Sequence, residues 1–332
     1  MTALLSAEWT RLFSRRVTVV TLVLIGLLLA VLTFGFTLTR STPTPDEIRL
    51  ADERAASAAE IYDRNVEQCE RVQSGLDNPQ SGQTFPRGCD YGPRPTRDSM
   101  LDYGFSFHRQ WPELYYTAAI VLAVAGFVLG ASFVGVEWSS GGMLSLLLWA
   151  PRRTSVLGAK LVAVCSGVTL ISIAYLMVWT LAFLAVAAGN GSVSSLTGGD
   201  VVSMLLTGIR VILLAVAGTA LGFAIASMGR HTSAALGVGI AYLVVYELGA
   251  LILFGLIGTD YSEKYRLSSY VSAWLTKSYT FEADVAACAG RGCVPAAGFS
   301  GSWQQGGLVI TVVVAVVLAA AFAAMHRRDA PR

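Results

Sequence analysis

The sequence predicts an all-α polytopic membrane protein whose chain crosses the bilayer six times. Of its 332 residues, 54% are hydrophobic and only 14% are charged, whereas about 25% charged residues are usual in soluble domains. The mean hydropathy is +0.58. Apolar runs of about 18 residues or more, the length that a transmembrane helix needs, recur along the chain. The net charge of +2 forms no dense basic patch, so no nucleic-acid partner is expected.

Six apolar stretches meet the length requirement and are interpreted as transmembrane spans. They are residues 17–39, 114–136, 156–188, 201–227, 233–257 and 306–325. The first stretch follows a basic segment, as a signal peptide would. Its apolar region is longer than the roughly 7–15 residues of a signal peptide, and no small-x-small cleavage site precedes Arg40. We therefore interpret it as a retained span.

Basic residues in the short connections predict the orientation of the chain. One set of flanks contains Arg11, Arg15, Arg16, Arg152, Arg153, Lys160, Arg230, Arg327, Arg328 and Arg332. The connection at 189–200 contains no Lys or Arg. Short loops rich in Lys and Arg remain in the cytoplasm, so we expect a multi-pass protein of the cell membrane with both termini cytoplasmic. Residues 41–113 and 258–305 then form exterior loops.

Two helices are expected outside the bilayer. Residues 2–16 predict an amphipathic cytoplasmic helix. Its apolar residues are Leu4, Leu5, Trp9 and Leu12, and its charged residues are Glu8, Arg11 and Arg15. In the first exterior loop, residues 44–47 read Thr-Pro-Asp-Glu, a capping box with proline at the first helical position. An exterior helix should therefore run from there to about Gly75.

The cysteines predict disulfides on the exterior side. An even number of cysteines in loops that face an oxidising compartment is typical of disulfides; these are Cys69, Cys89, Cys288 and Cys293, whereas Cys165 lies in the third span. We favour Cys69–Cys89 and Cys288–Cys293 because each pair closes a local loop. Cross-pairing between the loops and free thiols are the alternatives. No metal site is expected, because no CxxC pair exists and the three histidines lie on different sides of the membrane.

Motifs for catalysis or nucleotide binding are absent from the sequence. It contains no GxxxxGK[ST] phosphate loop, no GxSxG and no HExxH. We therefore expect no enzyme activity and no cofactor in this chain. An ion-coupled carrier is disfavoured because the spans contain few ionisable residues, notably Arg210 and Glu247.

Arg210 and Glu247 are expected to form an ion pair. Both lie at a similar depth from the exterior face, on consecutive antiparallel spans, and a lone charge at that depth is costly. The alternatives are that Arg210 extends to the interface, or that each residue faces a watery cavity. Two aromatic pairs at i,i+4 spacing, Tyr175/Trp179 and Tyr242/Tyr246, either line a substrate cavity or pack against neighbouring helices.

Glycines at four-residue spacing mark two helix contacts. Gly126 and Gly130 lie in the second span, and Gly218 and Gly222 lie in the fourth. Such pairs let two helices approach closely in lipid. They predict packing within one bundle, with a seam between two copies of the chain as the alternative.

The cytoplasmic segment 137–155 is unusually apolar for a connection. It begins at Glu137, ends near Pro-Arg-Arg, and has an apolar stripe at helical spacing that consists of Met143, Leu144, Leu147 and Leu148. A short apolar helix at this place lies in the membrane interface or fills a groove on a partner protein.

These features together resemble the permease subunits of ABC-2 type transporters. The resemblance rests on Glu-Trp-Thr-Arg-Leu at 8–12, Glu137, Gly-Met-Leu-Ser-Leu-Leu-Leu at 142–148, Ala-Pro-Arg-Arg at 150–153 and Leu-Gly-Ala-Lys at 157–160. Gly-Met stands where many relatives have Gly-Thr. The topology of six spans with a large first exterior loop agrees with it.

The resemblance implies that segment 137–155 is a coupling helix, which docks on a separate ATPase subunit. Glu137 would lie where the second span meets this helix, and a second contact would come from Arg230. Arg152, Arg153 and Lys160 would face phosphates or acidic partner residues, unless they serve only as cytoplasmic anchors. Two permease copies, identical or related, would bind two ATPases that hold ATP and Mg²⁺, in contact with membrane lipids.

The function implied by this resemblance is ATP-driven export of an amphipathic drug, lipid or peptide. Residues that are candidates for a substrate cavity are Tyr175, Trp179, Arg210, Tyr242, Tyr246 and Glu247. The alternative from another class is a membrane anchor or sensor that binds a ligand through its exterior loops.

Overall fold

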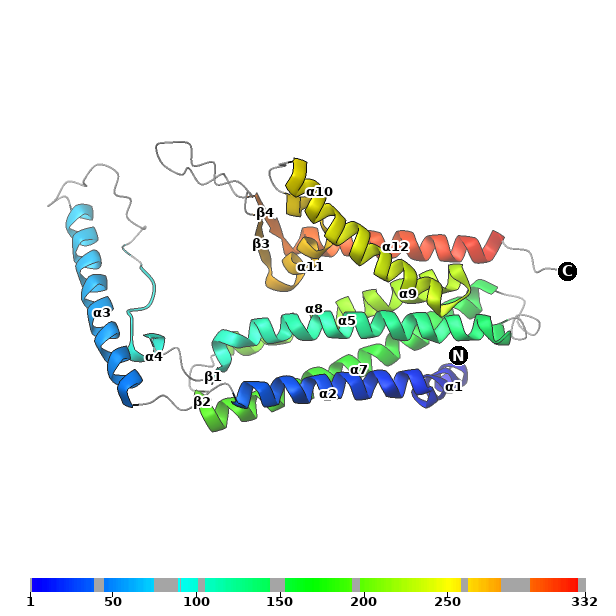
Figure 1. Ribbon diagram of the computed structural model, residues 1–332, viewed down its shortest axis with the longest axis horizontal. Helices are drawn as coiled ribbons and strands as arrows, with labels where there is room; N and C mark the ends of the chain where they lie inside the picture. Colours follow the sequence, from blue (N-terminus) through cyan, green and yellow to red (C-terminus); the bar gives the residue numbers. More distant parts are fainter. Residues whose placement is uncertain are drawn as a thin grey trace. The chain divides into compact units, whose positions relative to one another are not determined.

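The computed structural model describes residues 2–38, 45–74, 89, 91–100, 105–143, 153–192, 198–257, 262–281 and 299–327 (Figure 1). The chain divides into two compact units. The larger unit, which we call the bundle, consists of Met1–Val31, His108–Ala182 and Leu196–Arg332. The smaller unit, which we call the insert, consists of Leu32–Phe107 and Phe183–Ser195.

Long apolar helices dominate the chain. They are α2 (Arg16–Leu38), α5 (Phe107–Ser139), α7 (Arg153–Asn190), α8 (Gly198–Gly229), α9 (Thr232–Ala241), a π-helix at Tyr242–Leu248, α10 (Gly249–Ile257) and α12 (Trp303–Arg327). Within the described residues six stretches are long and apolar enough to cross a membrane, with α9 and the π-helix forming part of one such stretch. They coincide with the six apolar stretches of the sequence, so the predicted all-α polytopic fold is confirmed.

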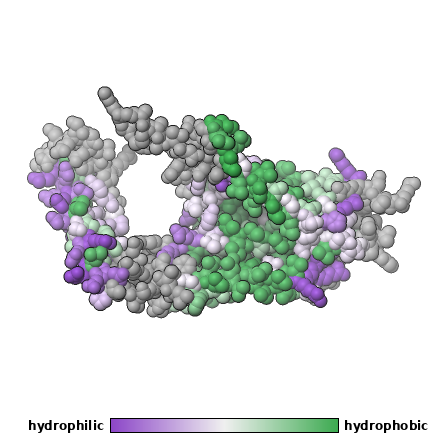
Figure 2. All heavy atoms as spheres, in the orientation of Figure 1, coloured by the Kyte–Doolittle hydropathy of each residue, from purple (hydrophilic) through white to green (hydrophobic). Residues whose placement is uncertain are grey.

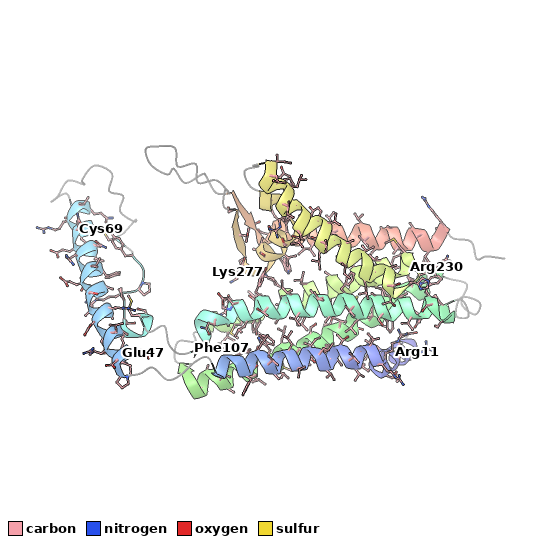
Figure 3. All side chains as sticks on the ribbon, in the orientation of Figure 1. Arg11, Glu47, Cys69, Phe107, Arg230 and Lys277 are labelled. Atoms are coloured by element: carbon pink, nitrogen blue, oxygen red, sulfur yellow. A yellow bond between two sulfur atoms is a disulfide. The ribbon has the colours of Figure 1, made fainter. Side chains whose placement is uncertain are left out.

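The bundle has two ends, which differ in their short elements. Helix α1 (Thr2–Ser14) lies at one end, and α11 (Leu267–Thr276) lies toward the other. Figure 3 shows Arg11 and Arg230 at the α1 end and Lys277 toward the α11 end. Apolar side chains form a broad band across the bundle in Figure 2, and hydrophilic side chains gather beyond it. This pattern is the one that a bilayer selects.

Helices α5 and α8 cross at very short distance through the predicted glycines. A Cβ on Gly130 would lie 2.1 Å from the carbonyl oxygen of Thr219, and a Cβ on Gly222 would lie 2.1 Å from that of Phe127. A Cβ on Gly126 would lie 2.6 Å from the carbonyl oxygen of Ala215, and a Cβ on Gly218 would lie 2.5 Å from that of Ala123. Both glycine pairs therefore contact the opposite helix within one chain, which confirms packing within the bundle. They are not exposed to contact a second copy.

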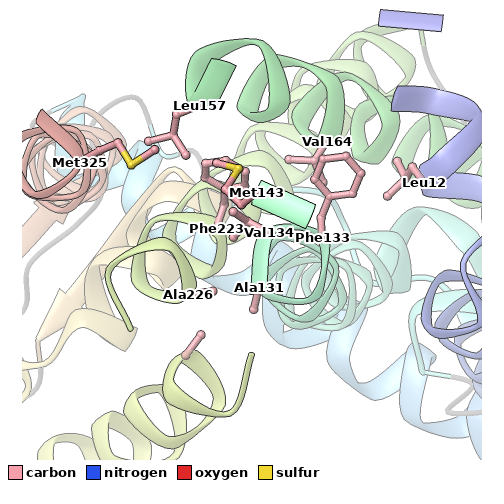
Figure 4. Close-up of a cluster of buried hydrophobic side chains, with 11 residues drawn as sticks. Leu12, Ala131, Phe133, Val134, Met143, Leu157, Val164, Phe223, Ala226 and Met325 are labelled. Atoms are coloured by element: carbon pink, nitrogen blue, oxygen red, sulfur yellow. The ribbon is translucent and has the colours of Figure 1, made fainter. Parts of the chain in front are cut away.

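A buried apolar core lies at the α1 end, where several helices meet (Figure 4). Leu12, Phe133, Met143, Leu157 and Phe223 are at most 1% exposed in this core. These five side chains come from α1, α5, the turn after α5, α7 and α8. In this core, α1 packs near Met143, which precedes segment 144–152, and near Leu157, which follows it. The segment itself lies outside the described residues.

The insert contains the helix that the capping box predicts. This helix, α3, extends over Pro45–Gln73, followed by the short α4 at Arg97–Met100. The sulfur atoms of Cys69 and Cys89 are bonded at 2.09 Å, with their Cα atoms 5.7 Å apart, which confirms the predicted pair. Cys288 and Cys293 lie outside the described residues, and Cys165 is a free thiol in α7.

Polar contacts also hold the chain that follows the disulfide against α3. The Arg94 guanidinium donates two hydrogen bonds to the Asp63 carboxylate, at 3.1 and 2.5 Å, and this contact raises the pKa of Arg94. The Tyr62 hydroxyl donates to the Gly92 carbonyl at 2.9 Å. A short parallel pair of strands, β1 (Phe105–Ser106) and β2 (Gly191–Ser192), also belongs to the insert.

The region expected to be an exterior loop at 258–305 contains regular structure. A 3₁₀ turn at Ser262–Tyr265 leads into α11, and a hairpin follows it. The hairpin pairs β3 (Ser278–Phe281) with β4 (Phe299–Ser302) in antiparallel register. Gly306 lets α12 lie against α11, because a Cβ there would be 2.4 Å from the Tyr270 carbonyl oxygen. Helix α11 is therefore packed on the bundle.

Candidate functional site

The junction of α1, α5 and α7 contains a buried charge network centred on Lys160. The Lys160 ammonium, on a side chain only 1% exposed, lies 2.9 Å from Glu8 Oε1 and 2.8 Å from Glu137 Oε2. The contact to Glu8 is a hydrogen bond. Both carboxylate side chains are also largely buried, with exposures of 6% and 12%. One cation thus bridges two helices other than its own.

Arg15, the residue between α1 and α2, completes the network. One of its terminal nitrogens lies 2.9 Å from Glu137 Oε1, and the other donates to the carbonyl oxygens of Ser132 and Phe133 at 3.2 and 2.8 Å. The guanidinium carbon of Arg15 lies 4.8 Å from the centre of the Phe133 ring. Lys160 lies 5.7 Å from the same ring centre. These cations therefore lie on an aromatic face as well as beside carboxylates.

Helix α1 also docks on α7 by shape and by a side-chain hydrogen bond. The Trp9 indole donates to the Ser166 hydroxyl at 2.9 Å. A Cβ on Gly167 would lie 2.4 Å from Leu12 Cδ2, so the glycine provides the space that Leu12 fills. The predicted amphipathic helix is thus part of the folded bundle, with Glu8 and Leu12 turned inward.

Two residues that were predicted to face a partner protein are instead buried within this chain. Met143 is 0% exposed in the core at the α1 end, so it does not extend an outward stripe with Leu144, Leu147 and Leu148. Lys160 faces the chain's own carboxylates rather than phosphates or partner acids. Glu137, likewise, is in the last turn of α5 and is paired internally.

Of the remaining coupling candidates, Arg230 is the one whose side chain the structure describes. It is exposed in the turn between α8 and α9, at φ 58°, with its guanidinium carbon 5.1 Å from the centre of the Trp138 ring. That contact brings the α8–α9 turn beside the end of α5. Arg153 is the first residue of α7. Leu144, Leu147, Leu148 and Arg152 lie outside the described residues.

The predicted ion pair between Arg210 and Glu247 was wrong. The Glu247 carboxylate instead lies 3.1 Å from Arg266 Nε, and accepts hydrogen bonds from the backbone N–H of Ser268 at 3.1 Å and its hydroxyl at 2.8 Å. Ser268 is in the first turn of α11, so Glu247 caps that helix from a neighbouring one. The pairing with the loop residue Arg266 was not visible in the sequence, because it depends on how the chain returns after α10.

A π-helix places Glu247 for this contact. The Tyr242 hydroxyl donates to Glu247 Oε1 at 2.6 Å. In an α-helix, two residues five positions apart would lie on different faces. The π-helix at Tyr242–Leu248 brings i and i+5 together. Tyr242 and Tyr246 stack with ring centres 5.4 Å apart, and the Tyr246 hydroxyl donates to the Tyr265 carbonyl.

The six candidate cavity residues lie in three separate places. Tyr242, Tyr246 and Glu247 belong to the contact with α11. On α7, Trp179 is buried, and the Tyr175 hydroxyl donates to the Leu22 carbonyl of α2, so this pair packs between helices. Arg210 lies 5.8 Å from the centre of the Trp274 ring and 4.9 Å from that of Trp303.

The sequence did not indicate the contact between Glu8 and Lys160 or the role of α11 with Arg266 and Ser268. Glu8 and Lys160 were assigned to separate features, and α11 with Arg266 and Ser268 was treated as loop. The regular spacing of Leu267, Trp274 and Leu275 was the available signal for α11. No pattern links positions 8 and 160, which are 152 residues apart.

Six apolar spans, with an amphipathic N-terminal helix packed on the second and third of them, define a polytopic membrane protein. The family comparison gives the class. The sequence matches the family described as ABC-2 family transporter protein over residues 4–330, and the chain belongs to that family. It is a multi-pass transmembrane permease of an ABC transporter, a component that is not itself catalytic. No curated protein and no solved structure matches the chain.

Proposed function

We propose that this permease couples ATP hydrolysis by a separate ATPase subunit to the export of an amphipathic substrate. The observation that carries the proposal is the family match, which covers residues 4–330. The sequence contains no phosphate-binding loop of its own. ATP and Mg²⁺ are therefore assigned to the partner.

The α1 end supports a route for this coupling. Met143 directly precedes segment 144–152 and Leu157 lies five residues after it, and both residues have 0% exposure in one core. Glu137 and Lys160, a few residues outside it, are ion-paired at 2.8 Å. A force applied to the segment would therefore reach α5 and α7 together, and α1 with them, since Glu8 lies on the same lysine. Leu144, Leu147 and Leu148 remain the proposed docking residues, with Arg152, Arg153 and Arg230 around them.

The exposed apolar surface of the bundle supports assembly with a second permease copy. Few residues in the most apolar 18-residue part of three spans are buried within the chain. The buried share is 17% in α2, 11% in α12 and 6% in the stretch Thr232–Phe254. Lipid covers such surfaces, and so does another copy. A pair of permeases with two ATPase subunits is the assembly we propose.

Leu147→Asp is expected to reduce the amount of ATPase bound to the permease by on the order of tenfold or more, because a charge would replace an apolar anchor in a groove. The measurement is the amount of ATPase that co-purifies with the detergent-solubilised permease. Leu50→Asp is the matched control, since Leu50 is an exposed leucine of α3 in the insert. Full retention of the ATPase by Leu147→Asp would remove the docking role and favour an anchor or sensor.

The proposed orientation, with both termini in the cytoplasm, predicts the side from which two serines are labelled. Ser57 in α3 and Ser140 after α5 are both exposed. In a variant with Cys165, Cys288 and Cys293 replaced by serine, Ser57→Cys should react with an impermeant maleimide on intact cells. Ser140→Cys should react only after permeabilisation. The reverse pattern would place the termini outside.

A further inference from the structure

An apolar groove lies between α7, α8, α11 and α12 of the bundle. Its volume is about 450 Å³, and its lining includes Cys165, Leu213, Trp274, Gly307 and Leu318. From Gly307 to Leu318 the groove follows α12 for 11 residues, or about 16 Å at 1.5 Å per residue. That length is about half of the ~30 Å hydrocarbon core. The groove therefore has the length of one leaflet.

The groove faces the surroundings of the bundle rather than its core. Leu213, which lines it, is 51% exposed, and only 11% of the apolar window of α12 is buried. A groove of this length and apolar lining fits an acyl chain. The open question is which headgroup goes with that chain, and the residues at the α11 end of the groove bear on it.

Arg210 lies just beyond the groove, three residues before Leu213 on α8. Its guanidinium carbon is 4.9 Å from the Trp303 ring centre, and the Trp274 indole donates to its carbonyl oxygen at 3.1 Å. Trp303 begins α12, and tryptophan at the end of a span marks the headgroup level. Arg210 is thus held at the depth where a lipid changes from acyl chain to headgroup.

The charge at this place is uncompensated within the described chain. No carboxylate of the described residues is ion-paired with Arg210, and its buried Nη1 has no hydrogen-bond acceptor there. A second cation lies toward the same end, since Lys277 Nζ donates to the Ser203 hydroxyl at 2.7 Å. Ser203 precedes Arg210 by seven residues, which is two turns on one face of α8. Its contact with Lys277 is with a neutral hydroxyl.

We propose that this groove is a selective site for an anionic phospholipid of the bilayer, with one acyl chain along α12 and the phosphate-bearing headgroup at Arg210 and Lys277. A guanidinium recognises a phosphate through charge-assisted hydrogen bonds. The two tryptophan rings hold the guanidinium side chain in place, and Gly307 makes the close approach to Trp274, because a Cβ there would lie 2.6 Å from that ring. The site is independent of the transported substrate and of the ATPase.

Brominated lipids test the site, because bromine on an acyl chain quenches a tryptophan that it touches. The protein is reconstituted in phosphatidylcholine vesicles with increasing brominated phosphatidylglycerol or, in parallel, brominated phosphatidylcholine. The signal of Trp274 is the difference between the protein and its Trp274→Phe variant. We expect brominated phosphatidylglycerol to quench this signal at a mole fraction on the order of tenfold lower, the ratio that one added charged hydrogen bond provides.

Arg210→Gln should make the two lipids equal quenchers, and Arg210→Lys should keep part of the preference. Arg230→Gln is the matched control, because Arg230 is an exposed arginine at the α1 end and should leave the preference unchanged. If Arg210→Gln does not fold, Lys277→Gln serves as the second variant and should reduce the preference. Equal quenching by both lipids in the unmodified protein, or a preference that survives the loss of Arg210, would overturn the proposal.

Discussion

Lys160→Met is expected to destabilise the bundle by about 3–5 kcal/mol, because it removes the buried cation that Glu8 and Glu137 share. Among the described residues, Glu8 then keeps only the exposed Arg11, and Glu137 keeps only Arg15. Lys160 is 1% exposed and is the cation nearest to Glu8. Methionine retains most of the side-chain volume, so the loss comes from charge and not from a cavity. The measurement is the thermal midpoint of the detergent-solubilised protein.

The control for this experiment uses the same carboxylate. Arg11 also pairs with Glu8 Oε1, at 3.3 Å, but its side chain is 57% exposed, so Arg11→Met should change stability by about 0–1 kcal/mol. The triple variant Lys160→Met, Glu8→Gln, Glu137→Gln should recover part of the loss, since neutral amides tolerate burial better than unpaired carboxylates. Equal midpoints for Lys160→Met and Arg11→Met would mean that the network contributes nothing to stability.

Gly130→Ala and Gly222→Ala are each expected to cost about 1–3 kcal/mol or more, because the added methyl overlaps backbone that cannot move aside. The new carbon would lie 2.1 Å from a carbonyl oxygen of the opposite helix in either case. Helices α5 and α8 would have to separate along their whole crossing. Size-exclusion chromatography after solubilisation should show less monodisperse protein.

Gly237→Ala provides the comparison for the glycine variants. Gly237 lies in α9 with no atom within 4 Å of the position of its Cβ, so alanine should be neutral or stabilising by up to about 1 kcal/mol. A seam between two copies predicts a different result for Gly130→Ala and Gly222→Ala, namely a folded chain that no longer pairs. Loss of pairing without loss of folding would therefore contradict the internal crossing.

The spans and the exterior helix could be predicted because their signals are local. Apolar length defines a transmembrane helix, and the capping box at 44–47 placed the start of α3, which extends over Pro45–Gln73. The Cys69–Cys89 pair was also foreseen from its short separation. Helix α11 was missed because it is only ten residues long and lies among polar and aromatic residues, where length gives no signal.

The charged contacts could not be predicted to the same degree, because they depend on tertiary packing. Glu247 was recognised as a buried carboxylate in need of a partner, yet the partner was chosen by depth alone. The π-helix turns Glu247 toward the N-terminus of α11, where Arg266 and the Ser268 N–H meet it. Lys160 was grouped with Arg152 and Arg153 and expected to face phosphates or acidic partner residues, or to serve only as a cytoplasmic anchor. The fold shows the two carboxylates around it.

The contact between Glu8 and Lys160 has a consequence for the order of events during synthesis. The two residues are 152 positions apart, and ribosomes add about 5–20 residues per second, so Glu8 emerges roughly 8–30 s before its partner exists. Throughout that interval α1 has neither the lysine nor the notch at Gly167. Docking of α1 on α7 is therefore possible only after the third span has been synthesised, and the order of the chain makes it follow the second span as well.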